Sequence, residues 1–167
     1  MKVLTQARKN AFMLFLGAHS CLTDAMETEL READLVPLAV YDVLVTLEMS
    51  DGGTMRMSEL ASHVLYSRSG LTRLVDRLET SGYVTRSRCP DDRRGFWCTL
   101  TEQGRQAREE AWPVVSRCMT EYFAKHLSKE ETEMFSRIMQ RIIGAVSESD
   151  SSEACRKVQT KEPPENE

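Results

Sequence analysis

The segment from Arg68 to Ser81 is the part of this sequence that most restricts the possible folds. At about 100° per residue, its apolar side chains fall on one narrow stripe and its polar side chains on the opposite side, which predicts a helix with one buried and one exposed face. Ser67 can cap the start of this helix, and Gly82 can end it because glycine readily adopts the left-handed conformation. The buried stripe comprises Leu71, Leu74, Val75 and Leu78, and the exposed face comprises Ser69, Thr72, Arg73, Asp76 and Arg77.

A β-hairpin is expected directly after this helix. Two stretches with strand-like alternation, residues 83–88 and 96–100, flank a loop that contains Pro90, paired aspartates and Gly95. In the second strand, one face is formed by Phe96, Cys98 and Leu100, and the other by Trp97 and Thr99. The loop between the strands is therefore a charged hairpin tip.

Helical patterns precede and follow this centre. A long helix is expected over residues 5–31 and a second one over residues 37–48. Residues 50–53 then form a loop, and Ser58 caps a short helix that ends near Val64.

Two more helices are expected after the hairpin. Thr101 can cap a helix that ends near His126. Ser128 and Glu131 form a capping box, in which each side chain bonds to the backbone amide of the other, and this box opens a last helix.

Charge is distributed unevenly along the chain. The formal net charge is −4, so the protein as a whole is neither a basic nucleic-acid coat nor a polybasic membrane binder. Between Met55 and Arg108, however, ten arginines and no lysine stand against six acidic residues. Arginine makes planar, bidentate contacts with phosphates and guanine edges, which lysine does not. A positive centre between acidic ends favours binding of a polyanion to one surface.

The order of the central elements is that of a winged helix-turn-helix. A short helix, a turn, an amphipathic helix with an exposed Arg, Ser and Thr face, and a hairpin with arginines at its tip follow one another. Such a helix fits the DNA major groove, and its N-terminal amides can bind a phosphate. Arginine at a narrow wing tip suits the minor groove of an A·T-rich stretch, where the negative potential is enhanced.

The central segment also resembles the DNA-binding core of the multiple antibiotic resistance regulator (MarR) family. The resemblance covers residues 58–104 and includes the stretches SRSGLTRLVDRLETSGYVTR and DRRGFWCTLTEQG. Its most specific marks are Leu71-Thr72-Arg73 with Asp76-Arg77-Leu78, then Gly82-Tyr83-Val84, and a wing pattern of Asp92, Arg94, Leu100, Thr101 and Gly104. The order of helices extends the resemblance to about residues 5–147.

The resemblance implies roles for individual residues. Those expected to face the major groove or its phosphates are Ser67, Arg68, Ser69, Thr72 and Arg73. Arg94 would enter the minor groove, and Asp92 would hold its guanidinium by a charge-assisted hydrogen bond. We also expect DNA contacts from Arg77 and Arg93. Arg77 and Arg86 could instead pair with Asp76, Glu79 or backbone.

The family forms twofold dimers through its terminal helices and binds pseudo-palindromic operators in double-stranded DNA, and the resemblance implies both for this chain. The first and last helices carry more apolar surface than a small winged domain can cover, which agrees with a homodimer. We therefore expect one mainly α domain with a small β wing at residues 5–147. Its parts are a winged helix-turn-helix at about 37–101 and dimerisation helices at about 5–31 and 101–147, followed by a disordered tail at 148–167.

The resemblance implies a transcriptional regulator, most simply a repressor that a small aromatic or phenolic effector releases from DNA. Candidate ligand-lining residues are His19, Tyr41, Arg86 and Trp97. One alternative is a regulator that senses thiol oxidation through Cys21 or Cys89, where Arg88 could favour the Cys89 thiolate. Another is a winged-helix protein-interaction module that does not bind DNA.

Other functions are not indicated. The five cysteines contain no C-x-x-C pair, so the sequence predicts neither a disulfide framework nor a zinc site and favours the reducing cytoplasm. The three histidines lack metal-ligand spacing and no nucleophile motif is present, so we expect no metal, cofactor or catalysis. Residues 2–18 crudely match a secretory signal, but the helical spacing continues to Leu30. No apolar run is long enough to cross a bilayer.

Overall fold

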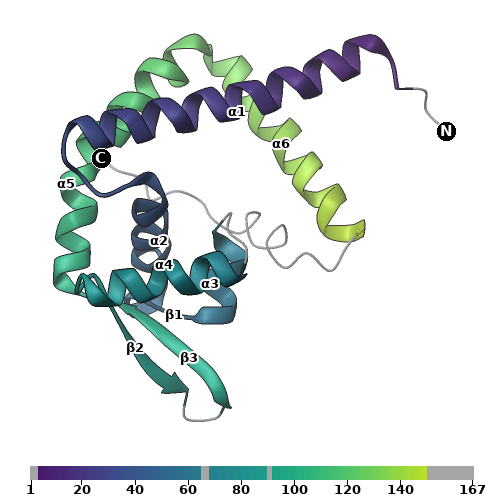
Figure 1. The fold of residues 1–167 in the computed structure, drawn as a ribbon. Coiled ribbons are helices and arrows are strands. Elements are labelled where there is room, and N and C mark those ends of the chain that lie inside the picture. Colours follow the sequence, from purple (N-terminus) through teal and green to yellow (C-terminus); the bar gives the residue numbers. More distant parts are fainter. Residues whose placement is uncertain (1–3, 65–67, 90–91, 150–167) are drawn as a thin grey trace.

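The structure is a computed structural model that describes residues 4–64, 68–89 and 92–149. Its elements in order are α1 (Gln6–Glu32), α2 (Leu38–Glu48), the 3-10 turn η1 (Asp51–Gly53), β1 (Thr54–Arg56), α3 (Met57–His63), α4 (Arg68–Thr80), β2 (Val84–Cys89), β3 (Asp92–Leu100), α5 (Glu102–Tyr122), the 3-10 turn η2 (Ala124–His126) and α6 (Lys129–Ser149). Figure 1 shows α2, α3, α4 and the sheet gathered in one body, from which α5 leads to α1 and α6. The expected fold class, mainly α with a small β wing, is confirmed.

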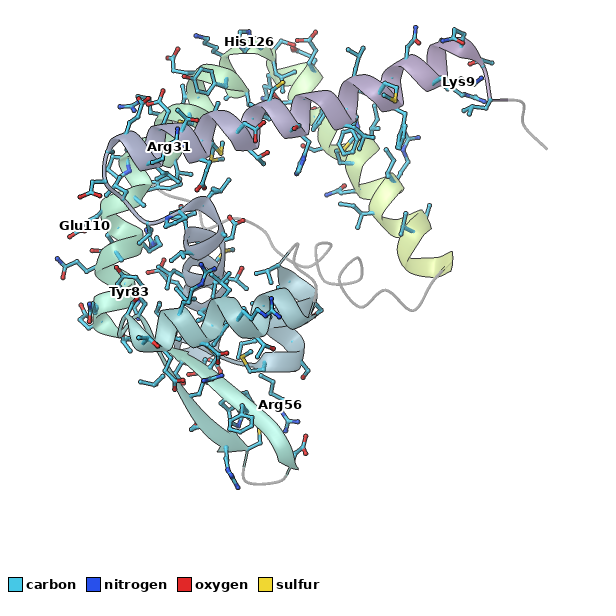
Figure 2. The ribbon with its side chains drawn as sticks, viewed as in Figure 1. Lys9, Arg31, Arg56, Tyr83, Glu110 and His126 are labelled. Carbon is cyan, nitrogen blue, oxygen red and sulfur yellow. The ribbon has the colours of Figure 1, made fainter. Side chains whose placement is uncertain are left out.

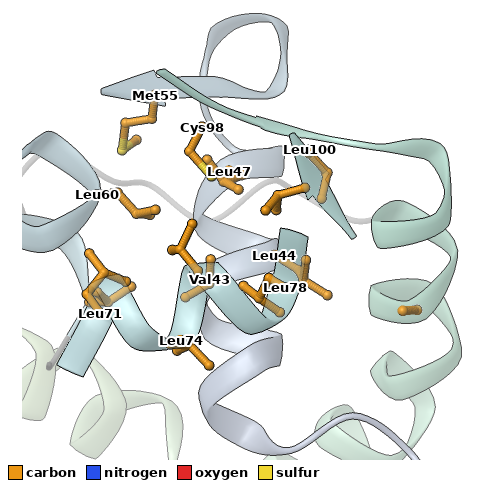
Figure 3. Packing of buried hydrophobic residues seen from close by; sticks show 14 residues of the cluster. Val43, Leu44, Leu47, Met55, Leu60, Leu71, Leu74, Leu78, Cys98 and Leu100 are labelled. Atoms are coloured by element: carbon orange, nitrogen blue, oxygen red, sulfur yellow. The ribbon is translucent and has the colours of Figure 1, made fainter. Parts of the chain in front are cut away.

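The apolar stripe of α4 lies at the centre of the core. Leu71, Leu74, Val75 and Leu78 are each at most 3% exposed. They share one cluster with side chains from α2, α3 and the sheet, among them Val43, Leu44, Leu47, Leu60, Cys98 and Leu100 (Figure 3). Burial of one such side chain stabilises the fold by about 1.5–3 kcal/mol. The stripe therefore fixes the rotation of α4 and turns the polar face of the helix outward.

A three-stranded antiparallel sheet of order β1-β3-β2 packs on this core. The sequence does not predict β1, which is three residues long and pairs only with Trp97 to Thr99 of β3. Beyond Trp97 the wing consists of β2 and β3 alone (Figure 1). Phe96 shares a strand face with the buried Cys98, but its own side chain is 41% exposed because it lies beyond the part of the sheet that covers the core.

The expected start of α3 is wrong. The helix begins at Met57 with Arg56 as its N-cap, and the amide of Arg56 donates to Oε2 of Glu59 at 3.3 Å. Ser58 therefore lies inside the first turn and does not cap it. The helix begins directly after β1 because the side chain of Glu59 caps the amide of Arg56, two residues before Ser58.

The expected cap at Ser67 lies outside the described residues, and the signals at Gly82, Thr101 and Ser128 agree with the structure. Gly82 has φ 75°, the left-handed conformation that ends α4. The amide of Gly104 donates to Oγ1 of Thr101 at 3.0 Å. In the capping box, the amide of Ser128 donates to Glu131 at 2.8 Å and the amide of Glu131 to the Ser128 hydroxyl at 3.3 Å. These are local signals, which is why the sequence predicts them.

The ends of the last two helices differ from expectation. α5 ends at Tyr122, and the 3-10 turn η2 replaces its expected continuation to His126. α6 continues to Ser149, and the remainder of the expected tail, residues 150–167, lies outside the described residues. None of the described helices is long and apolar enough to span a membrane.

Carboxylates on α1 and α2 link these helices to each other and to α5. Oε2 of Glu27 accepts from the amide of Leu38 at 2.8 Å, which satisfies a free amide at the start of α2. Two further carboxylates reach α5: Glu48 pairs with Arg105 (3.1 Å) and with Arg108, and Glu29 pairs with Arg117 (2.7 Å) and accepts from the Tyr122 hydroxyl (3.0 Å).

α5 meets the base of the wing with no space between them. A Cβ added at Gly104 would lie 2.2 Å from the carbonyl oxygen of Tyr83 and 2.8 Å from Cδ1 of Leu100. The Thr101 hydroxyl donates to the carbonyl of Gly82 at 2.6 Å. Only glycine fits at position 104, and the first turn of α5 is held rigidly against the wing.

Asp42 on α2 is a partly buried carboxylate. Desolvation by burial raises the pKa of Asp42 from its usual 3.8 to about 6. Between about pH 4 and 6 the folded protein therefore binds more protons than the unfolded chain, and the stability contributed by this group falls as the pH rises through that window.

We predict that Asp42→Asn raises the free energy of unfolding by about 1–2 kcal/mol at pH 7 and by much less at pH 4, because the variant has no charge to desolvate. Urea unfolding of both proteins at the two pH values measures this difference. Asp24→Asn, at an exposed aspartate of α1, is the control. An increase of equal size at both pH values would contradict the prediction.

Candidate nucleic-acid interface

The outer face of α4 is polar and open to solvent. Thr72, Arg73, Asp76 and Arg77 are all exposed, opposite the buried stripe of the same helix. This arrangement follows the period of 3.6 residues per turn that the sequence predicts. Of the other expected contacts, Ser67 lies outside the described residues, and Arg68 and Ser69 are described only as the backbone at the start of α4.

The wing projects from the body beside α4 (Figure 1). Arg88 of β2 is exposed, and Asp92 begins β3 opposite Cys89. Arg93 and Arg94 belong to the backbone of β3, but their side chains lie outside the described part of the structure, as does the expected contact between Asp92 and Arg94. Their place in the hairpin puts both arginines at the end farthest from the core.

Arg86 of β2 joins the wing to α4. Nη1 of its guanidinium lies 2.7 Å from Oδ1 of Asp76, and Nε and Nη2 donate to Oε2 of Glu79 at 2.8 Å and 2.5 Å. Its backbone amide also donates to Oε1 of Glu79, at 3.2 Å. The hydrogen bond to Glu79, together with the charges of Glu79 and Asp76, raises the pKa of Arg86 above its ordinary value. The pairing that the sequence allows as an alternative for Arg86 is therefore present.

A cation–π contact lies on the outer face of the sheet. The guanidinium carbon of Arg56 is 5.2 Å from the centroid of the Trp97 ring, and the two residues are partners in the register of β1 and β3. Figure 2 shows Arg56 beside the wing. The sequence gives no signal for this pair because it depends on β1, whose three residues carry no pattern of their own.

A cavity of about 370 Å³ lies where the α1–α2 connection, α4 and α5 meet. Most of its lining is apolar or aromatic, with Arg77 as the cationic side chain and Asp34 and Glu110 as the acidic ones. Apolar contributions come from Leu35, Val36, Pro37, Val40, Leu74, Leu78, Tyr83 and Ala107. A small molecule held here would touch the buried side of α4.

The four residues expected to line a ligand site do not gather at this cavity. His19 is exposed on α1, and Tyr41 is 6% exposed in a second apolar cluster, where burial raises its pKa. Arg86 is held by α4, and Trp97 lies against Arg56. The sequence missed the lining residues because they are ordinary core and loop positions that only the packing brings together.

The cysteines differ in exposure. Cys21 is exposed on α1, whereas Cys89 is 4% exposed and its thiol has little access to solvent. Cys98 is fully buried, and burial raises its pKa to about 12. Within the described residues, no three His, Cys, Asp or Glu side chains are grouped so that they could hold a metal ion.

Comparison with known proteins gives consistent matches. The model of the MarR family matches residues 36–95, from α2 to the wing. The transcriptional repressor MprA of Escherichia coli K12 is 29% identical over 104 residues, which are 62% of this chain and 58% of that protein. The chain thus spans less than two thirds of the length of this relative. An HTH-type transcriptional regulator of Bacillus cereus is 32% identical over 113 residues, 68% of this chain and 73% of that protein.

The fold is also similar to solved structures. Sco3205, a MarR family transcriptional regulator from Streptomyces coelicolor solved in complex with DNA, superposes with a TM-score of 0.78 and 28% identity. The alignment covers 85% of this chain and 89% of Sco3205. The similarity therefore extends beyond the winged part to the long helices.

The rate of thiol alkylation tests whether Cys89 and Cys98 are buried in the native protein. We predict that iodoacetamide alkylates Cys89 and Cys98 at least about tenfold more slowly in the native protein than in urea-unfolded protein, because the native thiols are buried. Mass spectrometry of peptides after timed quenching measures both rates, and the unfolded protein serves as the internal control. Equal rates for Cys89 in the two states would show that the base of the wing tip is open.

Proposed function

This chain belongs to the MarR family, and from this premise we propose that it is a transcriptional regulator that binds double-stranded DNA at specific sequences, most simply a repressor. The observation that carries the proposal is the outward polar face of α4, which the core fixes in place next to an arginine-tipped wing. The family consists of regulators and not of enzymes, in agreement with the expected absence of catalysis.

The major groove is the site proposed for α4. A helix fits that groove, and Arg73 and Arg77 can make bidentate contacts with guanine edges or contacts with phosphate, while Thr72 reaches a base or the backbone. Ser67, Arg68 and Ser69 are assigned to the first turn, where amide groups face a phosphate. The buried stripe supports this assignment because rotation of α4 would expose its leucines.

The minor groove is the site proposed for the wing. Arg94, oriented by Asp92, would enter the groove where an A·T-rich stretch narrows it, and Arg93 would contact the adjacent phosphates. The hairpin carries these residues beyond the sheet on two strands only, a width that a narrow groove can accept.

A twofold dimer is proposed to form through the terminal helices. Apolar side chains stand exposed along α1 and α6: Phe12, Met13, Leu14, Phe15, Leu16, Met134, Phe135, Ile142 and Val146. An exposed apolar surface of this extent favours association. Two wings related by a twofold axis match a pseudo-palindromic operator. The DNA complex of Sco3205, at 28% identity, supports DNA as the partner, and a regulator that binds DNA is proposed to act in the cytoplasm.

Release by a small aromatic acid is the proposed mode of regulation. The cavity behind α4 is large enough for one aromatic ring, and a carboxylate bound there would draw Arg77 away from its proposed contact with DNA. The cavity thus replaces the set of His19, Tyr41, Arg86 and Trp97 as the proposed ligand site. For the alternative of thiol sensing, Cys21 is the better candidate because it is exposed, whereas Cys89 is buried.

Arg73→Ala should cost on the order of 1–3 kcal/mol of binding free energy and relax base preference, because it removes a bidentate base contact.

Arg94→Ala should weaken binding mainly at A·T-rich flanks and reduce the slope of log K against log salt by about one. Fluorescence anisotropy measures both, with duplexes selected from random DNA by the wild-type protein.

Arg31→Ala on α1 is the matched control, because it removes the same charge from an exposed site away from α4 and the wing. If Arg73→Ala and Arg94→Ala bind as tightly as this control, the groove assignment is wrong. If the wild-type protein shows no salt-dependent affinity for any duplex, the chain is instead a protein-interaction module.

Salicylate, used as a probe of the aromatic-acid class, should raise the apparent Kd of the wild-type protein for its selected duplex at least about threefold. Ser81→Trp should abolish this effect and leave DNA affinity within about twofold, because Ser81 lines the cavity and a larger side chain fills it. A salicylate effect of equal size in the variant would exclude this cavity as the effector site.

A further inference from the structure

We infer that Arg86 is a positioning residue for DNA recognition, which sets the angle of the wing relative to α4 and neutralises two carboxylates beside the reading face. The inference rests on the proposed function, because it concerns how well the two DNA-contacting parts cooperate. It assigns to Arg86 a role that differs from the ligand contact expected from the sequence.

The geometry is that of a fork that spans one turn of helix. Asp76 and Glu79 are three residues apart on α4, so their carboxylates lie on neighbouring positions of the same side. The planar guanidinium of Arg86 reaches both, through Nη1 to Asp76 at 2.7 Å and through Nε and Nη2 to Glu79 at 2.8 Å and 2.5 Å. A lysine would carry the same charge but could not hold both partners in one plane.

Glu79 also binds the backbone of the wing. Its Oε1 accepts from the amide of Arg86 at 3.2 Å, so one carboxylate of α4 holds both the strand and its side chain. The bond to the amide ties the backbone of β2 to α4 in addition to the bonds made by the Arg86 side chain. The contact therefore defines where β2 lies, and not only where a guanidinium lies.

Because Arg86 lies near the base of the hairpin, a small change in angle there moves the far end of the wing. Arg86 is opposite Cys98, and the third strand supports β3 only from Trp97 to Thr99. Beyond that point, the two strands continue without support toward the tip. At about 3.3 Å per residue, Cys89 at the end of β2 lies about 10 Å beyond Arg86, so a rotation of about 10° at Arg86 moves that end of the strand by nearly 2 Å. Such a shift is enough to break a groove contact.

The second role is electrostatic. The side chains of Asp76 and Glu79 are 52% and 38% exposed, and Asp76 lies next to Arg73 and Arg77 on the outward face of α4. Without a cation they would repel DNA phosphates from the helix that must approach them. Arg86 supplies this cation from the wing and leaves the neighbouring arginines free to act on DNA.

The experiment compares Arg86→Ala, Arg86→Lys and Glu79→Gln with wild-type protein. The probes are duplexes selected from random DNA by the wild-type protein, prepared with either A·T-rich or G·C-rich flanks, and anisotropy is measured over a salt series. Arg105→Ala is the matched control, because it removes an arginine that pairs with Glu48 and Glu102, away from α4 and the wing tip. Thermal unfolding reports the stability of every variant.

Arg86→Ala should lose at least tenfold in affinity for the A·T-flanked duplex, should lose most of its preference between the flanks, and should show a salt slope reduced by about one. Arg86→Lys should keep the wild-type salt slope and still lose flank preference. Glu79→Gln leaves fewer unpaired charges than Arg86→Ala, because Arg86 keeps its pair with Asp76. This variant should also lose flank preference, and it tests the inference if Arg86→Ala does not fold. Arg105→Ala should remain within twofold of wild type on both duplexes.

If Arg86 has only a structural role, its variants should lose affinity equally for both duplexes, in proportion to their loss of stability. The ratio of the affinities for A·T-flanked and G·C-flanked DNA should then stay unchanged. That result, or affinities of Arg86→Lys and Glu79→Gln that match those of Arg105→Ala, overturns the inference and leaves the proposed function intact. Absence of salt-dependent binding by the wild-type protein overturns the proposed function, and the inference with it.

Discussion

Burial of one side of α4 is the constraint on which the rest of the molecule depends. Leu71, Leu74, Val75 and Leu78 can reach the core only in one rotation of the helix, and this rotation decides which residues face outward. The sheet, α2 and α3 complete the same cluster, so their placement follows from the same burial (Figure 3). The exposed polar face of α4 is thus a consequence of core packing, because the burial of the opposite side alone turns it outward.

The sequence predicts those features that depend on near neighbours. The stripe of α4, the glycine that ends it and the capping box at Ser128 are each set by residues within four positions, and all agree with the structure. β1 is not predicted because three residues are too few to show an alternating pattern, and they form a strand only by pairing with β3. The false cap at Ser58 has another origin, since the side chain of Glu59 caps the helix at Arg56, directly after this strand.

The candidate site shows the same division between local and non-local effects. The residue spacing predicts the polar face of α4. The contact of Arg86 with this helix is not predicted, because it joins two chain segments that meet only in the fold. The cavity behind α4 is likewise lined by residues from the α1–α2 connection, α4 and α5. Its members are core and loop residues with other evident roles, so no pattern along the chain marks them as a group.

The close approach of Gly104 to Tyr83 has a consequence for the molecule as a whole. Figure 2 shows Tyr83 where the wing, α4 and α5 meet. With no gap at this junction, α5 cannot slide over the winged part and acts as a stiff arm attached to it. In the proposed twofold dimer, a swing of this arm would change the separation of the two α4 helices, which on DNA would have to match the duplex repeat of about 34 Å. The missing side chain at Gly104 would then let movements at the far end of the protein alter the spacing of the two helices.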